Sequence, residues 1–439
     1  MFSNGTGVAR ARVAAVGIAL VVLAGAAAVG ATQLGGDAQP TQLQDSDSSG
    51  FDETVPLAEA ETRLGGETAN DTAGWSVANA GDVNGDGVDD LIVGAPRANT
   101  TGPNAGAAYI VYGPAESGNV SLSDADVTLR GEKRNDLAGW SVASAGDVDG
   151  DGYADVVVGA PYNDTAAPNA GAAYVVHGSE SLPSTMNLSA ATVTLLGEER
   201  NGLAGYAVAS WNATEGAGGV EEADDDAGES GIVVGAPMVD EGGENAGAAY
   251  LVGNGTLTDA LAEASAESTD EEATATLDLA DADATLLGEQ NGSHAGHAVA
   301  AAAEDGDAEV VVGAPRYDDT ADGAAGDAGV FGADDERANY TGAAYVLNAS
   351  ADGTVSLVDA TATLVGEAAG DRAGWSVAAG DLDDDSAVDA VVGAPYNSSA
   401  GPNAGAVYVV SGDELSDGDL ADADVRLTGA DGREQAGRS

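Results

Sequence analysis

The chain has 439 residues and a formal net charge of −60, with 14 lysines and arginines against 74 aspartates and glutamates. Such a surface repels the phosphate backbone of nucleic acid, so we exclude nucleic acid as a partner and expect a divalent cation or a cationic group. Because 44% of the residues are hydrophobic and valine-rich runs recur, we interpret the acidity as that of a folded protein in very salty water.

The N-terminus carries an export pattern. Residues 13–31 form an apolar run that follows Arg10 and Arg12, as is typical of a secretory signal with a small-residue cleavage site at Ala31. The run is also long enough to span a bilayer, so an uncleaved membrane anchor is the alternative for residues 1–31. Both interpretations predict an extracytoplasmic protein, secreted or at the cell surface. Residues 32–60 are polar and predict a linker, and no cysteine is present to form a disulfide.

Asn-X-Ser/Thr sequons are over-represented, because 12 of the 20 asparagines begin one. The excess predicts N-linked glycans on an exported protein, and polar loop composition is the alternative explanation. We expect exposed, glycosylated turns at Asn99, Asn163 and Asn397, which follow three similar segments. The other sequons begin at Asn4, Asn70, Asn119, Asn187, Asn212, Asn254, Asn291, Asn339 and Asn348.

A repeat fills residues 61–439. Each unit contains an "L-x-G" segment, an "AGWSVA"-like segment, a "VGAP" segment and an "AGAAY"-like segment, and we take these in that order as four short strands. Four-stranded units at a long period predict an all-β fold, a β-propeller of about five four-stranded blades. Residues 257–268 predict a short helix inside an insertion. The "VGAP" copies lie at residues 93–96, 158–161, 234–237, 312–315 and 392–395.

The ends of the repeat leave its closure open. A sixth "L-x-G" segment at 425–429 follows the fifth unit, so it competes with the segment near Thr62 to complete one blade. The last seven residues resemble the start of another unit, which predicts a truncated, incomplete propeller. The ring is then either closed on five blades or open, with unpaired strand edges that favour association.

The repeated motifs resemble those of FG-GAP repeat proteins and of the integrin alpha-subunit propeller. The "GAP" tripeptides match the second half of the motif, and a glycine matches the first half, although alanine replaces its phenylalanine. The near-absence of lysine also resembles proteins of extreme halophiles. The matching glycines are Gly74, Gly139, Gly205, Gly296 and Gly374, preceded by Ala73, Ala138, Ala204, Ala295 and Ala373.

Three acidic loops predict calcium sites. Oxygen ligands at loop positions 1, 3 and 5, a backbone carbonyl at 7 and a carboxylate at 9 suit a hard cation. The first loop offers Asp82, Asn84, Asp86, the Val88 carbonyl and Asp90. The second offers Asp147, Asp149, Asp151, the Tyr153 carbonyl and Asp155. The third offers Asp381, Asp383, Asp385, the Ala387 carbonyl and Asp389.

Two alternatives compete with calcium hairpins of the integrin type. An EF-hand needs glutamate at position 12, where these loops have valine, and a solvated acidic turn needs no metal. Position 6 is Gly87 or Gly152 in two loops but Ser386 in the third, which predicts a strained or weaker site there. The fourth unit aligns only Asp305 and Glu309 with ligand positions. In the third unit an acidic insertion at 212–231 replaces the loop.

No catalytic constellation emerges around the three histidines, and His297 takes the place of a tryptophan in other units, which predicts a packing role. The resemblance to integrin alpha chains implies a non-enzymatic binding or adhesion module at the cell surface, with a protein or glycan ligand. FG-GAP repeats also accompany hydrolases such as phospholipases, so an envelope-associated hydrolase is the alternative, and a structural surface component is another.

Overall fold

The computed structural model describes residues 62–115, 117–211, 230–267, 274–304, 307–319, 340–383 and 385–439. The predicted signal or anchor at 1–31 and the linker at 32–60 lie outside these residues. Within the described ranges, no helix is both long enough and apolar enough to cross a bilayer.

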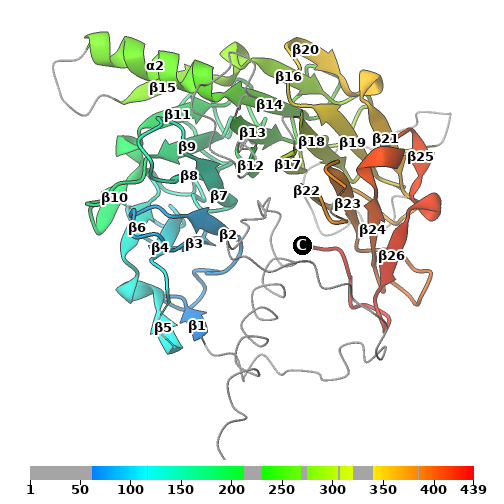
Figure 1. The fold of residues 1–439 in the computed structure, drawn as a ribbon, viewed down its shortest axis with the longest axis horizontal. Helices are drawn as coiled ribbons and strands as arrows, with labels where there is room; N and C mark the ends of the chain where they lie inside the picture. Colours follow the sequence, from blue (N-terminus) through cyan, green and yellow to red (C-terminus); the bar gives the residue numbers. More distant parts are fainter. Residues whose placement is uncertain are drawn as a thin grey trace, which may run out of the picture.

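Five blades of four antiparallel strands stand around a central axis (Figure 1), as the sequence predicted. The first blade has β2 (Val77–Gly81), β3 (Asp90–Ala95), β4 (Ala107–Val111) and β6 (Val127–Arg130). The second has β7 (Val142–Gly146), β8 (Asp155–Ala160), β9 (Ala172–Val176) and β11 (Val193–Leu196). The third has β12 (Ala207–Trp211), β13 (Gly231–Ala236), β14 (Ala248–Gly253) and β16 (Ala284–Leu287). The fourth has β17 (Ala298–Glu304), β18 (Asp307–Ala314), β19 (Ala343–Asn348) and β21 (Ala362–Val365). The fifth has β22 (Ser376–Gly380), β23 (Asp389–Ala394), β24 (Ala406–Val410) and β26 (Val425–Thr428).

The predicted grouping of strands into blades was wrong in one respect. The "L-x-G" strand does not open its own unit but forms the fourth strand of the preceding blade. In the first blade, β4 turns back onto β6 with Tyr109 opposite Thr128, and the chain then crosses to the innermost strand of the next blade. The innermost strands β2, β7, β12, β17 and β22 contact one another in succession. Each crossover therefore ties two neighbouring blades together covalently.

A short parallel strand from the following repeat joins the outer edge of four blades, so their sheets have five strands. These strands are β10 (Thr185–Asn187), β15 (Ala275–Asp278), β20 (Gly353–Ser356) and β25 (Gly418–Asp419). The predicted helix is α2 (Asn254–Glu267), which begins three residues earlier than expected. Short 3-10 turns precede the outer strands at η2 (Leu122–Asp124), η3 (Leu188–Ala190), η4 (Leu279–Asp281), η5 (Leu357–Asp359) and η7 (Leu420–Asp422), and another is η6 (Gly412–Glu414).

The two terminal "L-x-G" segments occupy different places. Val425–Thr428 (β26) completes the fifth blade, whereas β1 (Thr62–Gly65) pairs in parallel with β5 (Gly118–Ser121) beside the first blade. Among the described strands, β26 has no parallel outer partner. Figure 1 shows the first and fifth blades standing apart, and the described sheets do not close into a ring. The tail after β26 repeats the turn after β1, since Arg433, Gln435 and Gly437 have the positive φ angles of Asn70, Thr72 and Gly74.

Small residues set the spacing between blades. A Cβ added to Gly159 would lie 2.1 Å from the backbone oxygen of Gly205 in the next blade. We therefore expect Gly159→Ala to destabilise the protein by about 3 kcal/mol, because the interface is overpacked against the backbone. Gly255, in α2, has open space around its Cβ position, so Gly255→Ala is the matched control and should gain about 0.5 kcal/mol. Thermal unfolding of both variants measures this difference. Equal melting temperatures would contradict the close packing of Gly159 against Gly205.

The outer face of the fifth blade exposes residues that are core elsewhere. Leu427 is 55% exposed, whereas Leu129 and Leu195 at the same blade position are fully buried. We expect this face to promote concentration-dependent association, which Leu427→Asp should abolish and Val358→Asp, at another exposed apolar residue, should not. Light scattering during size-exclusion chromatography in molar salt measures the oligomeric state at each protein concentration. A monomer at every concentration would contradict this prediction.

Candidate metal centre

The three acidic loops, defined as residues 82–90, 147–155 and 381–389, occupy equivalent places in the fold. Each joins the innermost strand of a blade to the second strand, in the first, second and fifth blades. Because the innermost strands line the axis in the same direction, the three loops lie on the same face of the propeller.

The first residue of each loop organises its turn. In the second loop, Asp147 Oδ1 accepts hydrogen bonds from the N–H groups of Gly150 (2.8 Å) and Asp151 (3.1 Å), and its Oδ2 accepts one from Gly152 (2.9 Å). Asp82 and Asp381 accept equivalent bonds from backbone N–H groups of their loops. The repeated network shows that the spacing of these residues, and not only their charge, fixes the turn.

The ninth residue of each loop is buried at the start of the second strand. Asp155 is fully buried and accepts hydrogen bonds from the Val148 N–H and the Gly178 N–H, both at 2.8 Å. Burial raises the pKa of Asp155 to about 8, assisted by repulsion from Asp149 and Asp147. Burial likewise raises the pKa of Asp90 in the first loop. A bound cation would oppose this effect by favouring the ionised carboxylates.

The structure brings together part of each predicted ligand set. Carboxylate oxygens of Asp147, Asp149 and Asp155 lie within 4.8 Å of one another, and so do those of Asp381, Asp383 and Asp385. In the first loop the amide of Asn84 takes the third position, and its Oδ1 accepts from the Asp86 N–H at 2.9 Å. Asp151 and Asp389 are not part of these groups.

The seventh residues contribute through their backbone. The N–H groups of Val88, Tyr153 and Ala387 donate to the carboxylate at position 5 of their loops, at 2.9, 3.0 and 2.8 Å. This bond closes the same tight turn in all three loops. Coordination by their carbonyl oxygens stays a prediction.

The sixth residue of each loop adopts the left-handed conformation that the sequence predicted. Gly87 has φ +84° and Gly152 has φ +91°, and Ser386 has φ +70° at the same position. A side chain makes this conformation costly, so the third loop stores backbone strain that the first two avoid.

Sequence reasoning missed His177. Its Nδ1 lies 2.8 Å from Asp149 Oδ2 and its Nε2 lies 4.0 Å from Asp155 Oδ2. It follows β9, so the turn from the third to the fourth strand of the blade returns beside the acidic loop. The only sequence signal was its position directly after the "GAAYVV" strand, which no local motif marks as part of the site.

The remaining predicted ligand positions are those of the third and fourth units. The insertion at 212–229 and Asp305 lie outside the described residues. Glu309 is part of β18, where β17 and β18 continue pairing to Glu304 and Asp307. The described part of this hairpin therefore pairs where the other units have an acidic loop.

Aromatic side chains line the opposite end of the innermost strands. We name Trp75, Trp140, Tyr206, His297 and Trp375 the axial aromatic row. Successive ring centroids lie 4.8, 5.4, 5.1 and 4.8 Å apart, and Trp75 is 51% exposed. The packing role predicted for His297 is confirmed, and burial lowers its pKa to about 4.

Two of the asparagines that the sequence predicted as exposed glycan sites are buried in the structure. Asn163 and Asn397 are almost completely buried, so the expectation that both turns are exposed was wrong. The Asn163 amide nitrogen donates to the Tyr174 hydroxyl at 2.8 Å, and that of Asn397 donates to Asp371 Oδ2 at 2.8 Å. Asn99 is exposed because it lies one residue further along its turn, where Ala98 takes the buried place.

The burial of these amides predicts which sequons can carry sugar. We expect glycans, where the host adds them, on exposed Asn70, Asn99 and Asn119 but not on Asn163 or Asn397, because the attachment nitrogen of the latter two is engaged in the core. Glycopeptide mass spectrometry of native protein measures occupancy at each site. A glycan on Asn163 would contradict the described packing.

Comparison with known proteins agrees with the repeat pattern. The FG-GAP repeat model matches residues 73–111, 138–176 and 373–410, which span the first three strands of the first, second and fifth blades. Integrin alpha-PS2 of Drosophila melanogaster is 38% identical over 113 residues, covering 24% of this chain and 8% of the relative. Integrin alpha-IIb of Mus musculus is 40% identical over 105 residues, covering 23% of this chain and 10% of the relative.

Integrin alpha-6 of Homo sapiens is 34% identical over 116 residues, covering 26% of this chain and 9% of the relative. The chain therefore carries FG-GAP repeats and is similar to integrin alpha chains. The matched region is no more than a tenth of these relatives' length.

Proposed function

We propose that this chain is a calcium-stabilised, extracytoplasmic FG-GAP propeller that binds a protein partner at the cell surface, without enzymatic activity. The observation that carries the proposal is the division of the propeller into two faces. The axial aromatic row lies before the innermost strands and the acidic loops lie after them. A five-residue strand separates the two by about 17 Å.

Calcium is supported by the acidic loops. Two of them hold three carboxylates each within 4.8 Å, and all three are ordered by the same backbone hydrogen bonds. Oxygen-only ligands in a tight loop suit calcium, whose coordination is flexible and takes six to eight oxygens. Bound calcium would also neutralise part of the repulsion within each loop. We assign the ion a structural role, since it would link the first and second strands of a blade.

Partner binding is supported by the axial aromatic row. Large aromatic side chains that stay partly exposed are typical of the centre of protein interfaces. The row is held by the inner strands of five blades, so it presents a rigid surface. Integrin alpha chains use this kind of propeller for ligand and partner-subunit binding, as the resemblance implied. Export of the chain follows from its N-terminal pattern and is part of the proposal.

Affinity capture from native cell envelopes, in molar salt with calcium, tests the binding role. We expect a partner protein to be retained by the wild-type chain and lost with Trp75→Ala, because that ring is half exposed at one end of the row. Leu382→Ala is the matched control, because Leu382 is 60% exposed in the third acidic loop on the other face. Equal capture by both variants would contradict the assigned face. Turnover of an envelope lipid or glycan by the purified chain would instead indicate a hydrolase.

A further inference from the structure

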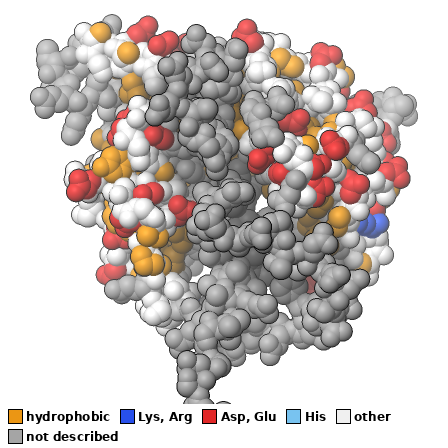
Figure 2. Space-filling view, viewed as in Figure 1, with side chains coloured by type: hydrophobic (Ala, Val, Ile, Leu, Met, Phe, Trp, Pro, Cys, Tyr) orange, Lys and Arg blue, Asp and Glu red, His pale blue; other side chains and the backbone are white. Residues whose placement is uncertain are grey.

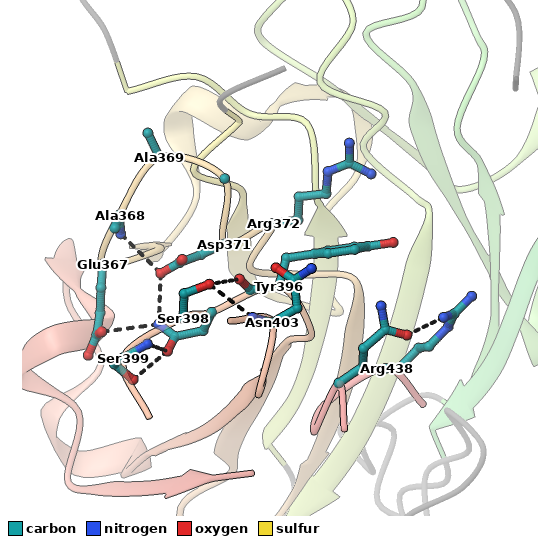
Figure 3. Close-up of a pocket in the computed structure, with 13 residues that line it drawn as sticks. Glu367, Ala368, Ala369, Asp371, Arg372, Tyr396, Ser398, Ser399, Asn403 and Arg438 are labelled. Carbon is teal, nitrogen blue, oxygen red and sulfur yellow. Dashed lines mark hydrogen bonds between the residues drawn. The ribbon is translucent and has the colours of Figure 1, made fainter. Parts of the chain in front are cut away.

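A pocket of about 700 Å³ opens beside the fifth blade (Figure 3). Its walls come from the loop that leads into the fifth blade, the loop between β23 and β24, and the tail after β26. A volume of this size is in the range of small-ligand sites. The residues that the argument uses are Glu367, Asp371, Arg372, Ser398, Asn403 and Arg438.

The carboxylates of this pocket already have partners. Glu367 Oε1 lies 2.7 Å from Arg426 Nη1, and Asp371 Oδ2 accepts hydrogen bonds from the Ala368 N–H (3.2 Å) and from the buried Asn397 amide (2.8 Å). Burial also raises the pKa of Asp371, which favours its neutral form. The negative charge at this end of the pocket is therefore compensated within the protein.

The other end of the pocket is cationic. Figure 3 shows Arg372 and Arg438 on the side away from Glu367 and Ser399. The Arg372 guanidinium lies over the Tyr396 ring, 4.9 Å from its centroid, and Arg438 donates to the Gln435 side chain. The pocket lining has two arginines and two carboxylates, and Arg426, beside Glu367, adds a further positive charge. On the face of the molecule that Figure 2 shows, Asp and Glu predominate over Lys and Arg.

We propose that this pocket binds an acidic sugar, such as a hexuronate residue of a glycan. The sugar carboxylate would pair with the guanidinium groups of Arg372 and Arg438, whose planar donors match a carboxylate. Its hydroxyls would meet Ser398 and Asn403, whose side chains can both donate and accept, and Glu367, whose carboxylate accepts. An acidic peptide would satisfy only the guanidinium end of such a polar cavity. The pocket borders the axial aromatic row, because Tyr396 packs edge-on against Trp375 with ring centroids 5.8 Å apart, but none of the five residues of the row lines it. Sugar binding is therefore tested without the protein partner proposed above.

Titration calorimetry with the purified full-length chain, in molar salt with calcium, tests the proposal. The probes are D-glucuronate, D-glucose, acetate and a penta-glutamate peptide. We expect glucuronate to bind at least about tenfold more tightly than any of the other three, because only it offers both the charge and the hydroxyls. Arg438→Gln should weaken glucuronate binding by about tenfold or more, and Arg372→Gln should act in the same direction.

Arg433→Gln is the matched control, because Arg433 lies on the same tail, is exposed and does not line the pocket. It should leave glucuronate binding unchanged, and circular dichroism of all variants checks folding. Absence of glucuronate binding to the wild-type chain would overturn the proposal. So would equal affinity for glucose, or equal affinity for acetate or the peptide, which would indicate a general carboxylate receptor. A loss of affinity in Arg433→Gln as large as in Arg438→Gln would overturn the assigned contact.

Discussion

Transfer of the calcium-free protein from molar to millimolar salt should unfold or aggregate it. The formal charge of −60 is distributed over a chain with only 14 basic residues. In the described structure the ion pairs between basic side chains and carboxylates include Lys133 with Glu132 at 3.9 Å and Arg426 with Glu367 at 2.7 Å, which offset little of this charge. The Debye length grows from about 3 Å at 1 M salt to about 30 Å at 0.01 M, so repulsion then acts across whole blades. Unfolding relieves it by separating the charges.

Circular dichroism across a sodium chloride series measures this transition. The control is a second series at low salt with sucrose, which strengthens apolar burial without screening charge. We expect sucrose to give little rescue, because the small alanine and valine core cannot offset unscreened carboxylates. A folded, soluble protein at about 10 mM salt without calcium would contradict the argument. Full rescue by sucrose would assign the salt effect to hydrophobic burial instead of screening.

The sequence predicted the blades because each strand type carries its own local signature. Valine runs end at "GAP", and a glycine with positive φ marks each crossover, as Gly139 and Gly205 do. The grouping of strands was not predictable in the same way. In a repeat, an outer strand can be counted with the blade before it or with the blade after it. The pairing of β4 with β6, which places Tyr109 opposite Thr128, shows that it belongs to the blade before it.

Two features of the candidate sites depended on three-dimensional contacts that short motifs do not carry. The sequon at Asn163 predicted an exposed turn, yet the side-chain amide of Asn163 is buried. Asn163 lies one residue earlier in its turn than Asn99 does in an otherwise similar turn. His177 comes beside Asp149 only because the blade folds back on itself. By contrast, the turn of each acidic loop was predictable, since most of its hydrogen bonds run within nine consecutive residues, as those of Asp147 do. Metal binding by these residues stays a prediction.

Removal of calcium should lower the melting temperature of the protein in molar salt, the second large effect that we expect. Each site that binds only the native state adds about 2.7 kcal/mol when free calcium is a hundred times Kd. Melting with calcium and then with a chelator measures the total for the acidic loops. An unchanged midpoint would contradict a structural role for the ion.

Asp151→Asn separates metal binding from simple loop charge. The variant keeps a side-chain oxygen that can accept from the Tyr153 N–H but removes one charge beside the group of Asp147, Asp149 and Asp155. With calcium it should melt below the wild type, because a ligand charge is lost. With chelator it should melt at or above the wild type, because repulsion within the empty loop is reduced. Asp259→Asn, at an exposed position of α2, should follow the wild type in both conditions. A variant that is less stable by the same amount with and without calcium would show that Asp151 only supports the turn, since the destabilisation caused by losing a metal ligand must disappear when the metal is removed.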